Sequence, residues 1–243
     1  MKSEKFKKIL LIFMGIVIVL GISFFVYVND FYSANKNFDE YRATYDTVQM
    51  IDNGEYISIK GSVSNSKGIV FYQGAKVEYT AYIPLLASLS QYGYECFLVK
   101  MPFHLAVFNT DAADKVISDN SNIADWYIGG HSLGGAMASS YASHNSDKLK
   151  GIILLGAYPS SDLSDTNLKM ISIYGENDLI INRDKLKETM VNAPSDSYYY
   201  EMSGANHGGF GDYGIQKGDG EAKISNSEQI KETSVIIVEV LSN

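Results

Sequence analysis

The sequence predicts an α/β protein in which a mostly parallel sheet is covered by helices on both faces. Strand-like apolar segments alternate with helix-like segments along most of the chain, which is typical of this fold class. Two of the strand-like segments, GIILLGA and KMISIYG, are continuous apolar runs, as expected for strands that are buried on both faces. Residues 46–243 contain no long linker and are long enough to form one domain with a sizeable core.

The first half of this domain supplies a hairpin and then alternating elements. The segments TVQMI and EYISIK flank Asp52-Asn53-Gly54, a turn sequence that predicts a β-hairpin. We then expect a strand at GIVFYQG, a helix at AYIPLLASLSQYG, a strand at ECFLVKMP and a helix at DAADKVISD. A strand at DWYIGG follows, and the small residues of 135–143 continue as a helix.

The second half continues the alternation and leaves no space for a large cap domain. GIILLGA and KMISIYG are predicted strands, and only about ten residues separate them, which is too few for an inserted domain. RDKLKETMVN is a predicted helix and SYYYEMS a predicted strand. Ser225 and Glu228 have the spacing of a capping box, which predicts a helix that continues to the C-terminus.

The N-terminus predicts a membrane anchor. Residues 9–28 carry no charge and as a helix would span about 30 Å, the thickness of a hydrocarbon core. Lysines at positions 2, 5, 7 and 8 precede this run, so we expect a cytoplasmic basic tail (1–8), a transmembrane signal anchor (9–28), a linker (29–45) and an extracytoplasmic domain (46–243). The alternatives are a cleaved signal peptide, with secretion of the domain, and a buried core helix.

Charge, cysteine content and histidine spacing indicate which partners and sites to expect. The net charge is −8, although the first eight residues include four lysines, so the rest of the chain is strongly acidic and does not suit nucleic acid. The only cysteine, Cys96, lies in an apolar run and is expected in the core. The four histidines show no zinc-binding spacing, so we expect neither a metal nor another cofactor.

A serine, an acid and a histidine each follow a predicted strand. Ser132 lies in GHSLGG after DWYI, Asp178 follows KMISIYG, and His207 follows SYYYEMS. Ligands of open parallel sheets bind beyond the carboxyl ends of the strands, so these side chains are expected to converge there. A nucleophile between a strand and a helix needs a tight turn, and Gly130 and Gly134 would remove side chains that clash with neighbouring strands.

These motifs resemble the α/β-hydrolase superfamily. The longer segments FYQGAKVEYTAYIPL, VKMPFHLAVF and NHGGFGDYGIQKGDGEAKIS are similar to a bacterial family of α/β-hydrolase-fold proteins related to dienelactone hydrolases, over roughly residues 55–243. The resemblance implies an α/β-hydrolase fold and a hydrolase mechanism, and it leaves the substrate open. Dienelactone hydrolases have a cysteine nucleophile, whereas this chain has Ser132.

The mechanism assigns a role to each candidate residue. Ser132 would attack an acyl carbonyl, His207 would act as base and acid, and Asp178, with Glu176 as the rival acid, would orient the imidazole. Two backbone N–H groups would bind the oxyanion, one from Leu133 and the other from Ala75, with Lys76 as the alternative.

The expected activity is hydrolysis of carboxylic esters or related small acyl compounds. An acyltransferase that uses the same three residues and a non-catalytic binding protein on the same scaffold are the alternatives. The expected partners are a small acyl substrate and, through the N-terminal helix, the membrane. Loops near the site suggest these pocket residues: Phe103, His104, Phe108, His131, Phe210 and Tyr213. His104 could equally pack in the core, and His131 could belong to the wall of the turn around Ser132.

Overall fold

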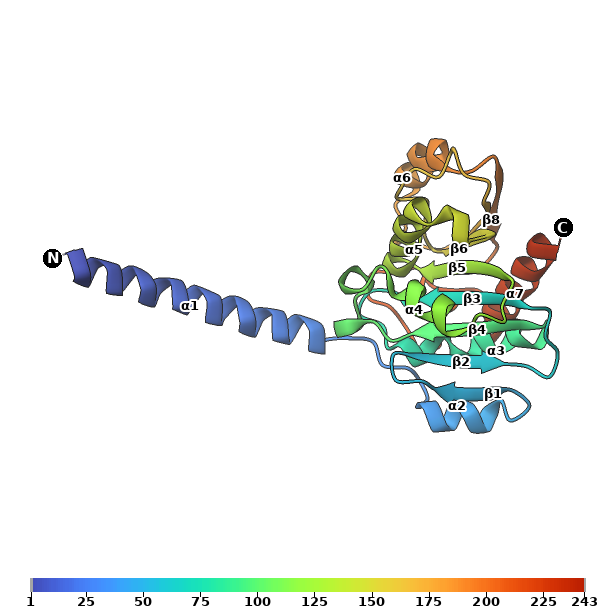
Figure 1. Ribbon diagram of the computed structural model, residues 1–243, viewed down its shortest axis with the longest axis horizontal. Helices are drawn as coiled ribbons and strands as arrows, with labels where there is room; N and C mark the ends of the chain where they lie inside the picture. The colour runs from blue at the N-terminus through green and yellow to red at the C-terminus, as the bar shows by residue number, and fades with distance from the viewer. Residues whose placement is uncertain (1, 243) are drawn as a thin grey trace. The chain divides into compact units, whose positions relative to one another are not determined.

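The computed structural model describes residues 2–242, and the chain divides into two compact units between Phe31 and Tyr32. The first unit consists of helix α1 (Lys2–Asn29), and the second contains a sheet with its covering helices (Figure 1). Met1, the first residue of the predicted basic tail, lies outside the described residues.

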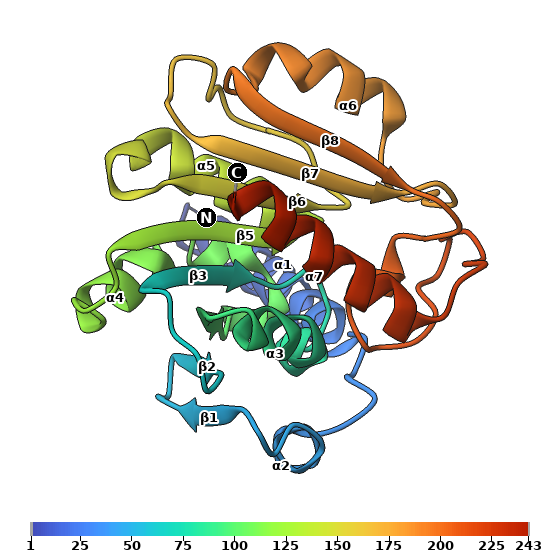
Figure 2. The same cartoon turned by 90° about the vertical axis from the view of Figure 1, so that its right-hand side faces the viewer.

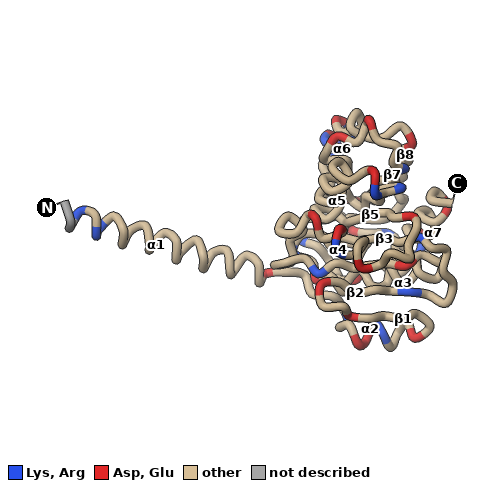
Figure 3. The backbone as a smooth tube through the Cα atoms, in the orientation of Figure 1, with Lys and Arg blue, Asp and Glu red and all other residues tan. Residues whose placement is uncertain are grey.

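Helix α1 is long and apolar enough to cross a membrane. The segment Lys5–Asn29 reaches a mean hydropathy of 3.1, and its apolar side chains are exposed. Basic residues of α1 lie near its start, and its middle carries no charge (Figure 3). A membrane anchor and a signal sequence share these features.

The second unit is built on one eight-stranded sheet with the order β1-β2-β4-β3-β5-β6-β7-β8. The first two strands and their neighbour β4 pair antiparallel, and all later pairs are parallel. The predicted hairpin is confirmed, with Gly54 at a φ of +86° in its turn. The strands are β1 (Gln49–Asp52), β2 (Tyr56–Lys60), β3 (Lys67–Tyr72), β4 (Tyr94–Val99), β5 (Asp125–His131), β6 (Gly151–Leu155), β7 (Lys169–Gly175) and β8 (Asp196–Met202).

Helices cover both faces of the sheet and bury two separate apolar clusters. The chain places α3 (Ile83–Gln91) and α7 (Asn226–Ser242) side by side on one face, together with Tyr41 of α2 (Phe38–Thr44) (Figure 2). Helices α4 (Ala112–Asp119) and α5 (Leu133–His144) contribute to the cluster on the other face. The α/β-hydrolase fold expected from the sequence is therefore observed, with a short α6 (Arg183–Glu188) before β8.

Short 3-10 turns occupy several connections. They are Tyr79–Tyr82, Pro102–His104, Ala106–Phe108, Ser146–Lys148, Thr189–Asn192 and Gly208–Phe210. Only residues 156–168 separate β6 from β7, so no cap domain is inserted there. The predicted capping box opens α7, because the Ser225 N–H donates to Glu228 Oε2 (2.8 Å) and the Glu228 N–H donates to Ser225 Oγ (3.2 Å).

The range 29–45, which we expected to be a linker, is in large part packed against the sheet unit. Tyr32 forms a parallel bridge with Val77, and Tyr41 is buried with its hydroxyl 2.8 Å from Asp212 Oδ2. Tyr32, Phe38 and Tyr45 are partly buried against the same apolar cluster as Tyr41, so aromatic side chains supply much of the packing. Composition alone did not distinguish such a segment from a linker.

Candidate active site

The three residues singled out from the sequence lie at one edge of the sheet. Strands β3 to β8 are parallel, so their carboxyl ends meet there. Ser132 follows β5, Asp178 follows β7 and His207 follows β8. This edge is where ligands bind in open α/β sheets.

Ser132 occupies a strained turn between β5 and α5. Its φ of 53° and ψ of −119° lie outside the regions that a side chain normally allows, which costs on the order of 1–3 kcal/mol. Hydrogen bonds on both sides hold the turn, because the Ser132 N–H donates to Leu155 O (2.9 Å) and the Ala136 N–H donates to Ser132 O (3.1 Å). The turn places the serine at the N-terminus of α5, where negative charge is favoured.

The glycines on either side of the serine make room for close backbone contacts. A Cβ on Gly134 would lie 2.3 Å from the carbonyl oxygens of Tyr72 and Gln73, at the end of β3. A Cβ on Gly130 would lie 2.4 Å from the carbonyl carbon of Gly134, which belongs to the first turn of α5. The expected clash with a neighbouring strand therefore applies to Gly134, whereas Gly130 is restricted by the helix that follows.

His207 and Asp178 are hydrogen-bonded and buried. His207 Nδ1 lies 2.8 Å from Asp178 Oδ2, so we assign the Nδ1 proton as donated to the carboxylate. The other oxygen of Asp178 accepts the N–H groups of Ile180 (2.9 Å) and Ile181 (2.8 Å), which fixes the carboxylate. Within residues 2–242, His207 Nε2 has no hydrogen-bond partner.

Glu176, the rival acid, lies in a different environment. Its carboxylate accepts the N–H of Gly204 (2.9 Å) and the hydroxyl of Ser203 (3.0 Å). These bonds lower the pKa of Glu176 and tie β7 to the turn after β8. The structure pairs Asp178, and not Glu176, with the imidazole of His207.

Two residues that the sequence did not predict to lie at the site hold the loop of His207. Gln229 on α7 accepts the N–H of Asn206 (3.2 Å) and donates to its carbonyl oxygen (2.8 Å). Asp219 Oδ2 accepts the N–H of Gly208 (2.8 Å). Gln229 is fully buried, and an isolated polar residue on the apolar face of a predicted helix is the sequence signal that could have identified it.

His131 connects the loop after β3 to His207. The Gly74 N–H donates to the hydroxyl oxygen of Tyr82 (3.0 Å), and that hydroxyl lies 2.8 Å from His131 Nδ1. The hydroxyl therefore donates to a neutral His131, whose Nε2 carries the proton. The rings of His131 and His207 are 4.5 Å apart. Burial, followed by the neighbouring His207, lowers the pKa of His131 well below its usual range.

We expect His131 to make the protein less stable as the pH falls below about 6.5. The unfolded chain binds a proton there that the folded protein excludes, so the free energy of unfolding falls with pH by up to about 1.4 kcal/mol per unit. Urea unfolding at about pH 6.5 and pH 5 measures this slope. His131→Asn should flatten it, although not completely, because burial also lowers the pKa of His104. Ser160→Ala provides the control, since serine does not titrate in this range and the slope should stay unchanged.

The two expected oxyanion donors have different surroundings. Leu133 is the first residue of α5, so its N–H has no partner within the helix. The Lys76 N–H donates to His104 O (2.9 Å) and is therefore occupied. The Ala75 N–H has no hydrogen bond to any described residue. The occupied Lys76 amide leaves Ala75 as the candidate from this loop.

A cavity of about 320 Å³ opens at the carboxyl edge, and both Ser132 and His207 line it. Its volume is at the lower end of the range for small-molecule sites. The other lining residues come mainly from α5 and from the loops after β6 and β7: Leu133, Ala136, Gly156, Ala157, Tyr158, Ser160, Ile180, Ile181 and Asn182. Nothing in the local sequence of these loops marks them as the wall of a pocket.

The pocket residues expected from the sequence do not line this cavity. Phe210 and Tyr213 are buried in the apolar cluster under α3 and α7, and His131 is bonded to Tyr82. Phe103 and His104 belong to the loop after β4. Phe103 is exposed there, and its ring packs edge-on against that of Phe108, another of the expected pocket residues. Aromatic residues near His207 in the sequence serve the core, which composition cannot distinguish from a binding wall.

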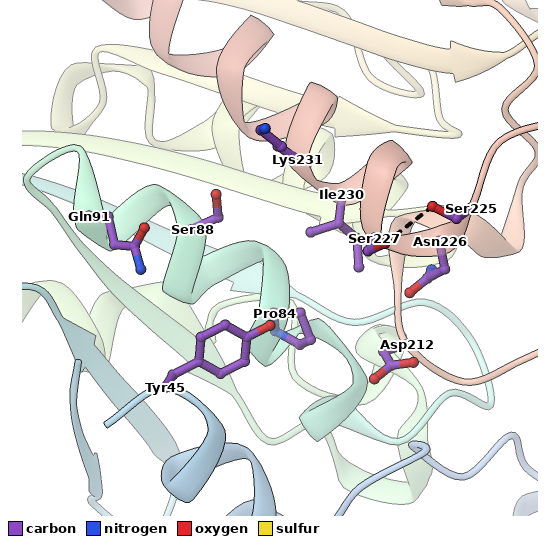
Figure 4. Close-up of a pocket in the computed structure, with 10 residues that line it drawn as sticks. All are labelled: Tyr45, Pro84, Ser88, Gln91, Asp212, Ser225, Asn226, Ser227, Ile230 and Lys231. Carbon is purple, nitrogen blue, oxygen red and sulfur yellow. Dashed lines mark hydrogen bonds between the residues drawn. The ribbon is translucent and has the colours of Figure 1, made fainter. Parts of the chain in front are cut away.

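A larger hollow of about 540 Å³ lies elsewhere, between α3 and the start of α7 (Figure 4). Ser88, which lines it, is hydrogen-bonded to Ser234 (2.7 Å), and Ser225 caps α7. None of Ser132, Asp178 and His207 lines it. It lies away from the three candidate residues, so the smaller cavity, which Ser132 and His207 line, is the candidate site.

The candidate site contains no visible arrangement for a metal. Among residues 2–242, no group of three or more His, Cys, Asp or Glu side chains is placed to hold one. Cys96 is buried in β4, and burial raises the pKa of its thiol. The groups at this edge whose arrangement suggests a reaction are Ser132, Asp178 and His207.

Comparisons with known proteins agree with this architecture. The model of a family described as "Alpha/beta hydrolase family" matches residues 68–231. Similar solved structures include a predicted CIB-like hydrolase from Thermoplasma acidophilum (TM-score 0.55, 19% identity, 79% of this chain and 97% of that chain covered). They also include a novel esterase from Mycobacterium tuberculosis (TM-score 0.59, 12% identity, 84% of this chain and 96% of that chain covered). A third is a monoacylglycerol lipase from Paleococcus ferrophilus (TM-score 0.59, 12% identity, 79% of this chain and 99% of that chain covered). No curated protein matches the chain significantly.

Proposed function

The chain belongs to the alpha/beta hydrolase family, and from that premise we propose that it is a serine hydrolase that cleaves carboxylic esters or related small acyl compounds. The observation that carries the proposal is the shared cavity. Ser132, on a strained turn at a helix N-terminus, and His207, bonded to a buried Asp178, line the same space of about 320 Å³. The esterases and lipases among the structural neighbours support the same class of reaction.

In the proposed reaction, the Ser132 hydroxyl attacks the ester carbonyl and His207 Nε2 accepts its proton. Asp178 keeps the Nδ1 proton in place and stabilises the imidazolium that forms. The N–H groups of Leu133 and Ala75 bind the oxyanion. His207 then protonates the leaving alcohol, and water releases the acyl group in a second step of the same kind.

The cavity offers apolar walls to an acyl group. Apolar side chains from α5 and from the loop after β7, among them Ala136 and Ile181, would contact the acyl chain. Tyr158 and Asn182 add polar groups that could orient the leaving alcohol. We also propose that the chain is related to the dienelactone hydrolases, with Ser132 in the place of their cysteine nucleophile.

We further propose that α1 is an uncleaved anchor. Its apolar length suits one crossing of a bilayer, and the lysines before it favour a cytoplasmic N-terminus. The hydrolase unit would then lie on the other side of the membrane. Nucleic acid is not a proposed partner, because the unit is acidic.

Labelling with a fluorophosphonate probe tests the nucleophile. We expect the wild-type protein to be labelled and Ser132→Ala to show no labelling, because the probe reacts with an activated serine hydroxyl. Ser160 lines the same cavity and is the matched control, so Ser160→Ala should remain labelled. Labelling that survives in Ser132→Ala would contradict the proposal.

A further inference from the structure

The chain enters the hydrolase unit at the edge that bears the candidate site. Tyr32 is the first residue of the unit, and its N–H donates to Lys76 O (2.7 Å) in the loop after β3. The Glu78 N–H donates to Tyr32 O (2.8 Å), and the Lys217 N–H, in the loop after β8, donates to the Tyr32 hydroxyl (3.0 Å). Tyr32 is therefore fixed between loops that follow parallel strands.

Only Asp30 and Phe31 separate Tyr32 from the end of α1 at Asn29. Three Cα–Cα steps span at most about 11 Å. If α1 crosses a bilayer, as proposed above, this tether holds the carboxyl edge of the sheet close to the lipid surface, whatever the orientation of α1. A longer linker would not impose this restriction.

The same edge carries exposed apolar side chains. Leu179 is 72% exposed and Ile215 is 93% exposed, so water contacts most of their surfaces. We name the whole set the apolar rim; its members follow β4, β7 and β8 and are Val107, Leu179, Ile180 and Ile215. Exposed apolar residues that gather on one edge indicate an interaction surface.

We infer that the apolar rim rests on the membrane to which the chain is tethered and that the enzyme takes esters whose acyl chains lie in that bilayer. This inference rests on the proposed function and the proposed anchor. Charge favours an apolar contact over an electrostatic one, because the rim loops carry Asp219 and Glu221 as well as Lys217 and Lys223. The expected lipid surface is therefore a neutral one.

Fluorescence from a label on the rim tests the contact directly. The full chain is reconstituted into phosphatidylcholine vesicles with an environment-sensitive dye on Ile215→Cys; Cys96 is buried and should not react. We expect blue-shifted emission and quenching by nitroxide-labelled lipid. The control is Val63→Cys, an exposed apolar position before β3 at the opposite edge, which should give neither effect. Equal water exposure of the two labels would overturn the inference, and so would a full chain that fails to float with the vesicles.

Activity on two esters with the same leaving group tests the consequence for the substrate. The triple variant Val107→Ser, Leu179→Ser and Ile215→Ser should hydrolyse vesicle-bound 4-methylumbelliferyl decanoate about tenfold more slowly or worse, while its rate on soluble 4-methylumbelliferyl acetate changes less than about twofold. The matched control is Val63→Ser with Val191→Ser, two exposed positions that precede strands, and it should match the wild type on both esters.

The outcomes separate this inference from the proposed function. Equal losses of the triple variant on both esters, or no loss on either, would overturn the rim inference. Activity that survives Ser132→Ala on both esters would overturn the proposed function itself. Two results together support the rim inference and the proposed function: the triple variant loses activity on the decanoate alone, and Ser132→Ala is inactive on both esters.

Discussion

Replacing His207 with Gln is expected to lower kcat/KM for 4-methylumbelliferyl acetate by about 10⁴-fold or more. Gln cannot accept the serine proton, so Ser132 would lose its base while the oxyanion donors remain. Asp178→Asn should cost about 10³- to 10⁴-fold, because an amide no longer stabilises the imidazolium or favours the correct tautomer. The measurement is steady-state kinetics of purified variants whose circular dichroism spectra match that of the wild type.

The control for His207 is His144, which is exposed at the end of α5. His144→Gln should keep kcat/KM within about twofold of the wild-type value. The double variant His207→Gln with Ser132→Ala should be no slower than the slower single variant, since the two side chains act as one unit. Full activity in His207→Gln would remove the basis for the proposed mechanism.

Gly134→Ala is expected to have the largest effect on stability among single methyl additions at the site. The new Cβ would lie 2.3 Å from two backbone oxygens, those of Tyr72 and Gln73, and backbone at the end of a central strand cannot move aside as a flexible side chain can. We expect the free energy of unfolding to fall by about 3 to 5 kcal/mol, or the chain to fail to fold.

Chemical unfolding with urea measures this effect, and Gly208→Ala is the matched control. A Cβ on Gly208 would meet nothing closer than 3.5 Å, which is ordinary contact, so the change should be below about 1 kcal/mol. Similar stabilities for the two variants would show that the β3–α5 contact is more adaptable than the close packing of its backbone implies.

The sequence predicted the fold because its local signals agree with one another. Gly54 in its hairpin, the apolar runs of β6 and β7, and the Ser225–Glu228 capping box each specify an element without help from distant residues. The convergence of Ser132 with His207 could be anticipated from the rule that loops after parallel strands share an edge. Strand order and helix placement then supply the geometry.

The cavity wall could not be predicted in the same way. Tyr158 and Ile181 come from loops after two different strands, and nothing in their local sequence marks them as lining residues. Phe210 and Tyr213, which the sequence suggested instead, lie near His207 along the chain but turn into the core. The buried bond between Tyr82 and His131 joins residues 49 positions apart and depends on tertiary packing alone.

The burial of Tyr41 has a practical consequence for producing the protein without its hydrophobic helix. A shortened version should begin at about residue 30, directly after α1. Beginning at residue 46 would remove the buried Tyr41 from the core, and Asp212 would lose the hydrogen bond that the Tyr41 hydroxyl donates to it. A version without α1 should therefore keep residues 30–45, although their composition resembles that of a linker.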